Sequence, residues 1–269
     1  MSLVPPPSKL RWAVVLVTTS ILIISMAACG TPATPASAST ADAETAQTAS
    51  GPSILLFVGT GTSSTDVTAV ETILSTNKLA YATVNSAQLD DMSQTELMHY
   101  KLLIVPGGNS ITIGENLTST ATNSVHDAVQ NGLHYLGICA GGFFGGYSEY
   151  NGLNLTSGVW FNFFEDYYEG IDKAAVQISQ PNGTKLDQYW QEGPQFTGWG
   201  SIVGKYSDGT PAIVEGKSGS GWVILAGIHA EAPASWRDGM TFTTPVQTDN
   251  AYAYTLINAA LNGTSLPHY

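Results

Sequence analysis

Short apolar runs alternate with amphipathic stretches along the chain from residue 51 to residue 138. Apolar runs that end at Gly, Pro or Asn are typical of buried strands, and apolar residues three or four positions apart are typical of helices. The predicted strands cover residues 53–58, 81–84, 102–105 and 134–138. The predicted helices cover residues 95–100 and 124–130, and a further one carries Val67, Val70, Ile73 and Leu74. This alternation predicts an α/β fold with a parallel sheet that helices cover on both faces.

The rest of the chain has a different pattern. Residues 143–199 are rich in aromatic residues and irregular, so we expect an aromatic-rich insert there. Strand-like apolar runs return afterwards, at residues 202–206, 212–215 and 222–226. The polar, glycine-containing stretches between these runs predict C-terminal β-hairpins. Residues 249–261 predict a closing helix.

The first 28 residues have the layout of a secretory signal peptide. Lys9 and Arg11 precede an apolar run, which ends in small residues directly before Cys29. Small residues before a cysteine resemble the bacterial lipobox, in which the cysteine carries a lipid and becomes the mature N-terminus. We therefore expect a lipoprotein-type signal peptide at 1–28 and lipid attachment at Cys29, with an uncleaved N-terminal helix anchor as the alternative. Either interpretation places the rest of the protein outside the cytoplasm of a bacterium, anchored to the cell membrane.

Residues 29–51 are mostly Ala, Thr, Ser and Pro. Because they contain no large apolar side chain, they cannot bury enough surface to offset chain entropy, and they predict a flexible linker. The remaining residues, 52–269, suit one domain with a sizeable core.

The charge balance narrows the range of partners. The chain has 9 Lys plus Arg against 21 Asp plus Glu. Nucleic-acid binding needs clustered basic side chains, so we expect no nucleic-acid partner, and we expect the lipid to be the membrane anchor. The acidic residues Glu165, Asp166, Glu169 and Asp172 lack an ordered ligand spacing, and we interpret them as a solvated face rather than a cation site. We expect neither a metal nor a cofactor.

Cys139 stands in the strongest candidate motif, Gly-Ile-Cys-Ala-Gly-Gly, directly after the predicted strand 134–138. A glycine-flanked turn of this kind raises a nucleophile above the carboxyl edge of a sheet. The amide of the next residue, Ala140, then points at a developing oxyanion. The alternative is a small buried cysteine at a tight turn, because free cysteine is commonly a core residue. If Cys29 carries a lipid, Cys139 is the sole free thiol of an exported domain, which favours a functional role.

Two further motifs follow predicted strands. His229 and Glu231, in Gly-Ile-His-Ala-Glu, supply an imidazole base and a carboxylate that can fix its tautomer. Pro-Gly-Gly at 106–108 ends the strand 102–105, and the amide of Gly108 is a candidate second oxyanion donor. Taken alone, the histidine has a structural interpretation and the Pro-Gly-Gly motif is a turn. Ligands of open α/β sheets bind at the carboxyl edge where such motifs meet.

In this order, the three motifs resemble those of the class I glutamine amidotransferase-like superfamily. The continuation Cys-Ala-Gly-Gly-Phe-Phe-Gly-Gly from Cys139 is most similar to the N-terminal domain of eukaryotic-type biotin-protein ligases, which also occurs as free-standing bacterial proteins. The resemblance implies a flavodoxin-like, mostly parallel sheet with helices on both faces. It also implies a triad of Cys139 as nucleophile, His229 as base and Glu231 as orienting group, with Gly108 and Ala140 as oxyanion donors. The resemblance does not lead us to infer biotin transfer, because no ligase catalytic domain follows within the given sequence.

Two functions are consistent with these motifs. The first is a membrane-tethered, extracytoplasmic hydrolase, in which Cys139 attacks an amide or acyl group of an unidentified small molecule or peptide and water resolves the thioester. The second is a non-catalytic module on the same fold that binds a small ligand or a cell-envelope fragment. The aromatic residues from Phe143 to Tyr168 either line a pocket over Cys139 or pack as core, and we favour packing.

Overall fold

The computed structural model describes residues 51–269. The predicted signal peptide at 1–28, the lipid attachment at Cys29 and nearly all of the predicted linker lie outside the described residues. Residues 51–269 include no helix with the length and apolar character that a membrane crossing requires.

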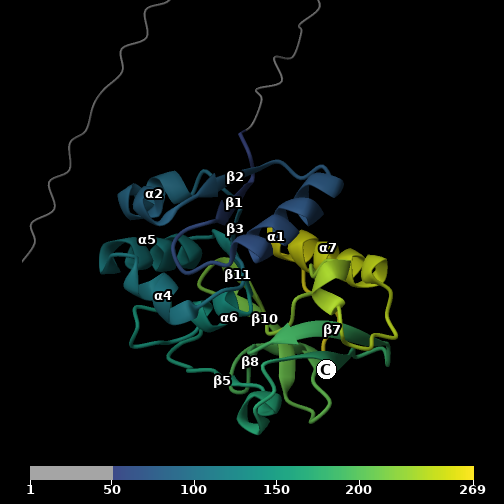
Figure 1. The fold of residues 1–269 in the computed structure, drawn as a ribbon. Coiled ribbons are helices and arrows are strands. Elements are labelled where there is room, and N and C mark those ends of the chain that lie inside the picture. Colours follow the sequence, from purple (N-terminus) through teal and green to yellow (C-terminus); the bar gives the residue numbers. More distant parts are fainter. Residues whose placement is uncertain (1–50) are drawn as a thin grey trace, which may run out of the picture. The chain divides into compact units, whose positions relative to one another are not determined.

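A nine-stranded sheet runs through the middle of the domain (Figure 1). One half of it is parallel, with the strand order β2-β1-β3-β4-β11 that is typical of flavodoxin-like sheets. These strands are β1 (Ile54–Phe57), β2 (Tyr81–Val84), β3 (Leu102–Val105), β4 (His134–Ile138) and β11 (Gly221–Ala226). The inner strands β1 and β3 are apolar and fully buried, as expected where helices cover both faces. The predicted α/β fold is confirmed.

An antiparallel extension continues the sheet beyond β11. It consists of β10 (Pro211–Ser218), β9 (Ser201–Lys205), β6 (Lys173–Ser179) and β7 (Lys185–Gln191). The hairpins that join β9, β10 and β11 agree with the prediction. A small second sheet pairs β5 (Asn162–Phe163) with β8 (Pro194–Gln195). Strands β6 and β7 lie in the segment 143–199, which the sequence predicted to be irregular. Strand β7 was not predicted because it buries the polar side chains of Asp187 and Gln188, which break the apolar pattern of a strand.

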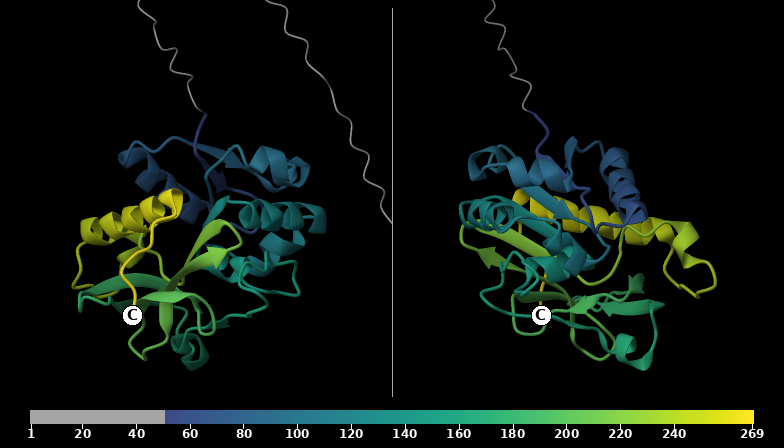
Figure 2. Two further views of the ribbon diagram at one scale, coloured as in Figure 1. Left: turned by 180° about the vertical axis from the view of Figure 1, so that it is seen from behind. Right: turned by 60° about the vertical axis from the view of Figure 1, so that its left-hand side comes forward.

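Helices cover the two faces of the parallel half (Figures 1 and 2). One face packs against α1 (Ser64–Thr76) and α7 (Val246–Asn262), and the other against α2 (Ser86–Asp91), α3 (Gln94–Leu97) and α5 (Ser119–Gln130). Within β1, Ile54 and Leu56 belong to the first core and Leu55 and Phe57 to the second, because side chains alternate along a strand. Two short helices, α4 (Ser110–Glu115) and α6 (Ala140–Gly145), follow β3 and β4, and the 3-10 helices η1 (Glu165–Glu169) and η2 (Ala234–Arg237) lie in later loops.

Side chains rather than water satisfy the first amides of several helices. Ser63 caps α1 by accepting from the amide of Asp66, and Asn109 caps α4 by accepting from the amide of Thr112. Such caps stabilise a helix start by about 1 kcal/mol each. Both caps follow parallel strands, so they fix where the chain turns back at the carboxyl edge of the sheet.

Helix α6 lies unusually close to strand β3. A Cβ atom on Gly141 would stand 1.9 Å from the carbonyl oxygen of Val105, and one on Gly137 would stand 2.2 Å from the carbonyl oxygen of Gly141. No real Cβ tolerates such distances from backbone, so glycine is required at both positions. The glycines of the Gly-Ile-Cys-Ala-Gly motif therefore permit the contact that places Cys139.

Replacing Gly141 with Ala is expected to lower the free energy of unfolding by about 1–3 kcal/mol, because the added methyl group forces β3 and α6 apart. Denaturant titration followed by circular dichroism measures this. Gly51→Ala is the control, since a Cβ atom at Gly51 meets nothing within 4 Å. Equal stability of the two variants would contradict the tight packing.

Candidate active site

A cavity of about 520 Å³ opens at the carboxyl edge of the parallel strands. Cys139, Ala140, Gly108 and His229, which sequence analysis singled out from three separate motifs, all line it. Glu231 lies behind His229 and contacts it. The structure therefore brings these five residues together, and only Cys29 lies outside the described residues.

Cys139 occupies a strained turn between β4 and α6. Its backbone has φ 49° and ψ −106°, a conformation that costs free energy in a residue with a side chain. Its amide donates to the carbonyl of Ala226 at 2.7 Å, and its carbonyl accepts from the amides of Gly142 and Phe143. The thiol is unpaired and only 6% exposed, and it donates to the carbonyl of Gln191 at 3.4 Å. The turn thus aims the sulfur at the cavity floor.

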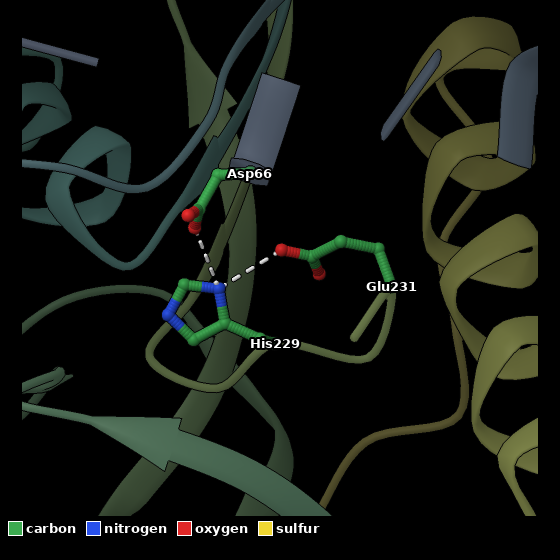
Figure 3. A group of neighbouring side chains, drawn as sticks. All are labelled: Asp66, His229 and Glu231. Carbon is green, nitrogen blue, oxygen red and sulfur yellow. Dashed lines mark hydrogen bonds and ion pairs between the residues drawn. The ribbon is translucent and has the colours of Figure 1, made fainter. Parts of the chain in front are cut away.

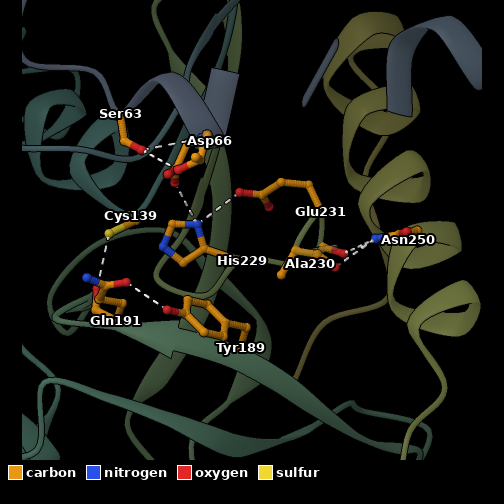
Figure 4. A network of polar contacts seen from close by, with 11 residues as sticks. Ser63, Asp66, Cys139, Tyr189, Gln191, His229, Ala230, Glu231 and Asn250 are labelled. Atoms are coloured by element: carbon orange, nitrogen blue, oxygen red, sulfur yellow. Dashed lines mark hydrogen bonds and ion pairs between the residues drawn. The ribbon is translucent and has the colours of Figure 1, made fainter. Parts of the chain in front are cut away.

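His229 lies between two buried carboxylates (Figure 3). Its Nδ1 atom is 2.9 Å from Glu231 Oε1 and 3.1 Å from Asp66 Oδ1. Because both carboxylates take the same nitrogen, Nε2 is left free to face elsewhere. Figure 4 shows Cys139 on the side of the ring opposite Glu231. A proton on Nδ1 is therefore held in place by the two carboxylates, and Nε2 is not engaged by either of them.

Asp66 is a site residue that the sequence analysis missed. It stands in the first turn of α1, and that helix was recognised only through its apolar residues. The loop after β1 reaches the same edge as the loops after β3, β4 and β11, since all these strands are parallel. The only sequence signal for Asp66 is an acidic residue in the first turn of the helix that follows a parallel strand.

Glycine is required at both positions after Pro106, and the reason differs between the two. A Cβ atom on Gly107 would stand 2.1 Å from Asp66 Oδ1 and 2.7 Å from His229 Cε1, so glycine leaves room for that contact. Gly108 has φ +144°, and a Cβ atom there would stand 2.1 Å from the carbonyl oxygen of Gly61. Within residues 51–269, the amides of Gly108 and Ala140 donate no hydrogen bond.

Charges at the site favour a protonated imidazole. Burial alone would lower the pKa of His229, but its electrostatic contacts with Cys139 and Glu231 and the hydrogen bond that it donates to Asp66 raise this pKa well above its usual value. Burial likewise would raise the pKa of Asp66, yet its contact with His229 brings it below the usual value. The two shifts are opposite in direction and consistent with each other, because both favour a charged imidazolium beside a charged carboxylate.

Asp66, His229 and Glu231 also form a group that could hold a metal ion, since their ligand atoms lie within 4.8 Å of one another. A metal ion on Nδ1 would have to displace the proton there, because metal ligands must be deprotonated. The raised pKa of His229 opposes that exchange. A proton shared by two carboxylates accounts for the geometry without an ion.

Neighbouring elements hold the histidine loop in place. The side-chain amide of Asn250 on α7 donates to the carbonyls of Ala230 and Ala232 at 3.1 and 3.4 Å. The rings of Tyr189 and Trp236 pack edge-on against the imidazole, with centroids 5.8 and 5.7 Å away. These rings exclude water from one side of His229 and strengthen its electrostatic contacts.

We predict that His229 titrates above pH 6.5 in the wild type and at a lower pH in Cys139→Ala, because that variant removes the side chain that contributes most to raising the pKa of His229. NMR titration of the imidazole signals measures both values. His134 serves as an internal control, since burial and Lys101, rather than Cys139, lower its pKa. An unchanged titration of His229 in the variant would show that the thiol and the imidazole are not coupled.

Comparison with known proteins supports the family predicted from the sequence. Residues 52–152 match the family described as biotin-protein ligase, N terminal. A biotin-protein ligase of Schizosaccharomyces pombe is 27% identical over 162 residues, which are 49% of this chain and 26% of that protein. The chain thus spans about a quarter of the length of this relative. Cys139, Ala140 and Gly108 lie inside the family match, and His229 and Glu231 lie beyond it.

Solved structures with some similarity include an exo-β-1,4-mannosidase from Opitutaceae bacterium strain TAV5, with 14% identity and a TM-score of 0.49 over 78% of this chain and 36% of that chain. A mutant of Schizosaccharomyces pombe DJ-1 has 19% identity and a TM-score of 0.27 over 33% of this chain and 58% of that chain. The predicted resemblance is therefore confirmed by the sequence comparisons: in residues 52–152 this chain is similar to the N-terminal domain of biotin-protein ligases.

Proposed function

We propose that this domain is a cysteine-dependent hydrolase of amides or related acyl groups. The observation that carries the proposal is the position of His229, whose Nδ1 is held by two buried carboxylates while its ring faces the cavity beside Cys139. An imidazole held in this way can exchange a proton with the thiol and with a leaving amine. The strained turn at Cys139 is a second supporting feature, because strain of this kind clusters at functional sites.

In the proposed reaction, the thiol of Cys139 gives its proton to Nε2 of His229, and the thiolate sulfur attacks the carbonyl carbon and forms a C–S bond. The amides of Gly108 and Ala140 donate to the oxyanion. Nε2 of His229 gives its proton to the leaving nitrogen as the C–N bond breaks, which leaves a thioester. Water then attacks the thioester while His229 accepts a proton, and the acid and the free thiol are released. Asp66 and Glu231 stabilise the imidazolium in both steps.

A binding module without turnover is the second candidate. It is favoured by the low exposure of Cys139 and by the hydrogen bond from its thiol to the Gln191 carbonyl, which a nucleophile has to give up before it attacks. The two candidates differ in whether the thiol reacts.

Labelling with iodoacetamide tests the reactivity of the thiol. We predict that Cys139 reacts in the folded wild type and at least about tenfold more slowly in His229→Ala at neutral pH, because the thiolate is the nucleophile and loses its imidazolium partner. Peptide mapping by mass spectrometry separates Cys139 from Cys29. His99→Ala is the matched control, since His99 is exposed and does not line the cavity. An inert Cys139, or labelling that ignores His229, would exclude the hydrolase.

Turnover is tested with a library of thiol-directed activity probes and simple amides. The hydrolase predicts a covalent acyl adduct on wild-type protein that hydroxylamine removes and that Cys139→Ala lacks. Reversible binding of equal strength to wild type and Cys139→Ala, without an adduct, would favour the binding module.

We further propose that the protein is a bacterial lipoprotein held at the outer face of the cell membrane through Cys29. The apolar run followed by small residues and cysteine supports this. Labelling of growing cells with a tagged fatty acid is expected to mark the wild type and Cys139→Ala but not Cys29→Ala. A wild type that stays in the membrane fraction without label would support the uncleaved anchor instead.

A further inference from the structure

A second cavity of about 270 Å³ lies beside the candidate active site. It shares Ser110, Ile111, Phe143 and Phe163 with the cavity that contains Cys139, so the two are neighbours across a common wall. We call this second cavity the aromatic recess. Its lining also includes aromatic side chains from the insert, which are Phe144, Tyr147, Tyr150, Trp160, Phe161, Tyr167 and Tyr168.

The aromatic residues of the insert fall into two groups, buried core residues and exposed residues of the recess. Phe164 and Phe196 are buried core residues outside the recess, at 1% and 0% exposure. In contrast, Tyr147, Trp160 and Tyr168 are 46%, 47% and 67% exposed, although large rings are usually covered. Gathered exposed rings of this kind mark a binding surface.

The wall of the recess is built by ring contacts. Phe163 stacks on Tyr167 with centroids 3.9 Å apart, and Phe143 meets Phe163 edge-on at 4.9 Å. Phe143 lies on α6, one turn after Cys139. Helix α6 therefore positions both the thiol and one wall of the recess. A ligand whose ring lies in the recess would have its reacting bond at a set distance from the Cys139 sulfur.

The recess selects for a neutral ligand. Among the described residues, none that lines it carries a charge, and its polar groups are the hydroxyls of serine and tyrosine, the indole of Trp160 and the amide of Asn162. Helix η1, which contributes Tyr167 and Tyr168 to the lining, also carries the carboxylates of Glu165, Asp166 and Glu169, and their negative charge repels anions. Its volume lies just below the range of about 300–1,000 Å³ that is usual for drug-sized ligands, so it suits one ring.

We propose that the aromatic recess binds a neutral saccharide ring whose amide substituent reaches Cys139. A sugar ring has an apolar face that stacks on Trp160 or a tyrosine and hydroxyls that pair with the polar groups at the rim. The amide part of this inference rests on the proposed hydrolase, and the ring-binding part does not require turnover.

Calorimetric titration of the full-length protein with N-acetylglucosamine and its short β-1,4-linked oligomers tests the ring. Binding is expected in the wild type and in Cys139→Ala, and Trp160→Ala is expected to raise Kd about tenfold or more. Tyr168→Ala is a second variant at an exposed position, so loss of folding does not confuse the result. Tyr269→Ala is the control, because Tyr269 is 50% exposed and lies outside the recess.

Two further probes test the chemistry of the ligand. Glucuronate, which is anionic, and benzamide, which is a flat aromatic amide, are both expected to bind at least about tenfold more weakly than the neutral sugar. The proposal fails if no neutral saccharide binds, if Trp160→Ala binds it as tightly as the wild type, or if either probe binds as well. Sugar binding without amide cleavage would leave the recess assigned and remove the hydrolase. Cleavage of simple amides without sugar binding would support the hydrolase and contradict the saccharide site in the recess.

Discussion

The close contact between α6 and β3 is the constraint on which the rest of the site depends. The carbonyl of Val105 leaves no room for a side chain at Gly141, and this proximity forces the chain to turn sharply at Cys139. The turn needs a positive φ in a residue that has a Cβ, a cost of about 1–3 kcal/mol that surrounding packing has to offset. The same helix then carries Phe143 into the wall between the two cavities.

The second organising interaction is the pair of carboxylates on one imidazole nitrogen. Asp66 comes from the first turn of α1 and Glu231 from the loop after β11, so segments far apart in sequence meet at His229. Gly107 has to lack a side chain for this meeting to occur. Because two negative groups share one proton, the ring is oriented and its protonated form stabilised at the same time. One carboxylate would be enough to orient the ring alone or to stabilise its protonated form alone.

Local pattern was sufficient to predict much of the fold and part of the site. Strands β2, β3 and β4 have the predicted bounds, and β3 in particular is a continuous apolar run in a doubly covered part of the sheet. Cys139 and His229 could be found because glycine-rich motifs mark the strand ends. Asp66 could not be found in that way, since a single acidic residue in a first helical turn is common for reasons of the helix dipole. Strand β7 was missed because its buried Asp187 and Gln188 find partners only in the folded state, Thr243 and Asp249.

The shared nitrogen also gives the most direct test of the account. The rate at which iodoacetamide labels Cys139 is to be compared among wild type, Asp66→Asn, Glu231→Gln and the double variant, each shown by circular dichroism to be folded. Because either carboxylate can still hold the Nδ1 proton, the account predicts small losses in the single variants and a much larger, non-additive loss in the double variant. A double variant that labels as fast as the wild type would contradict a working pair of Cys139 and His229.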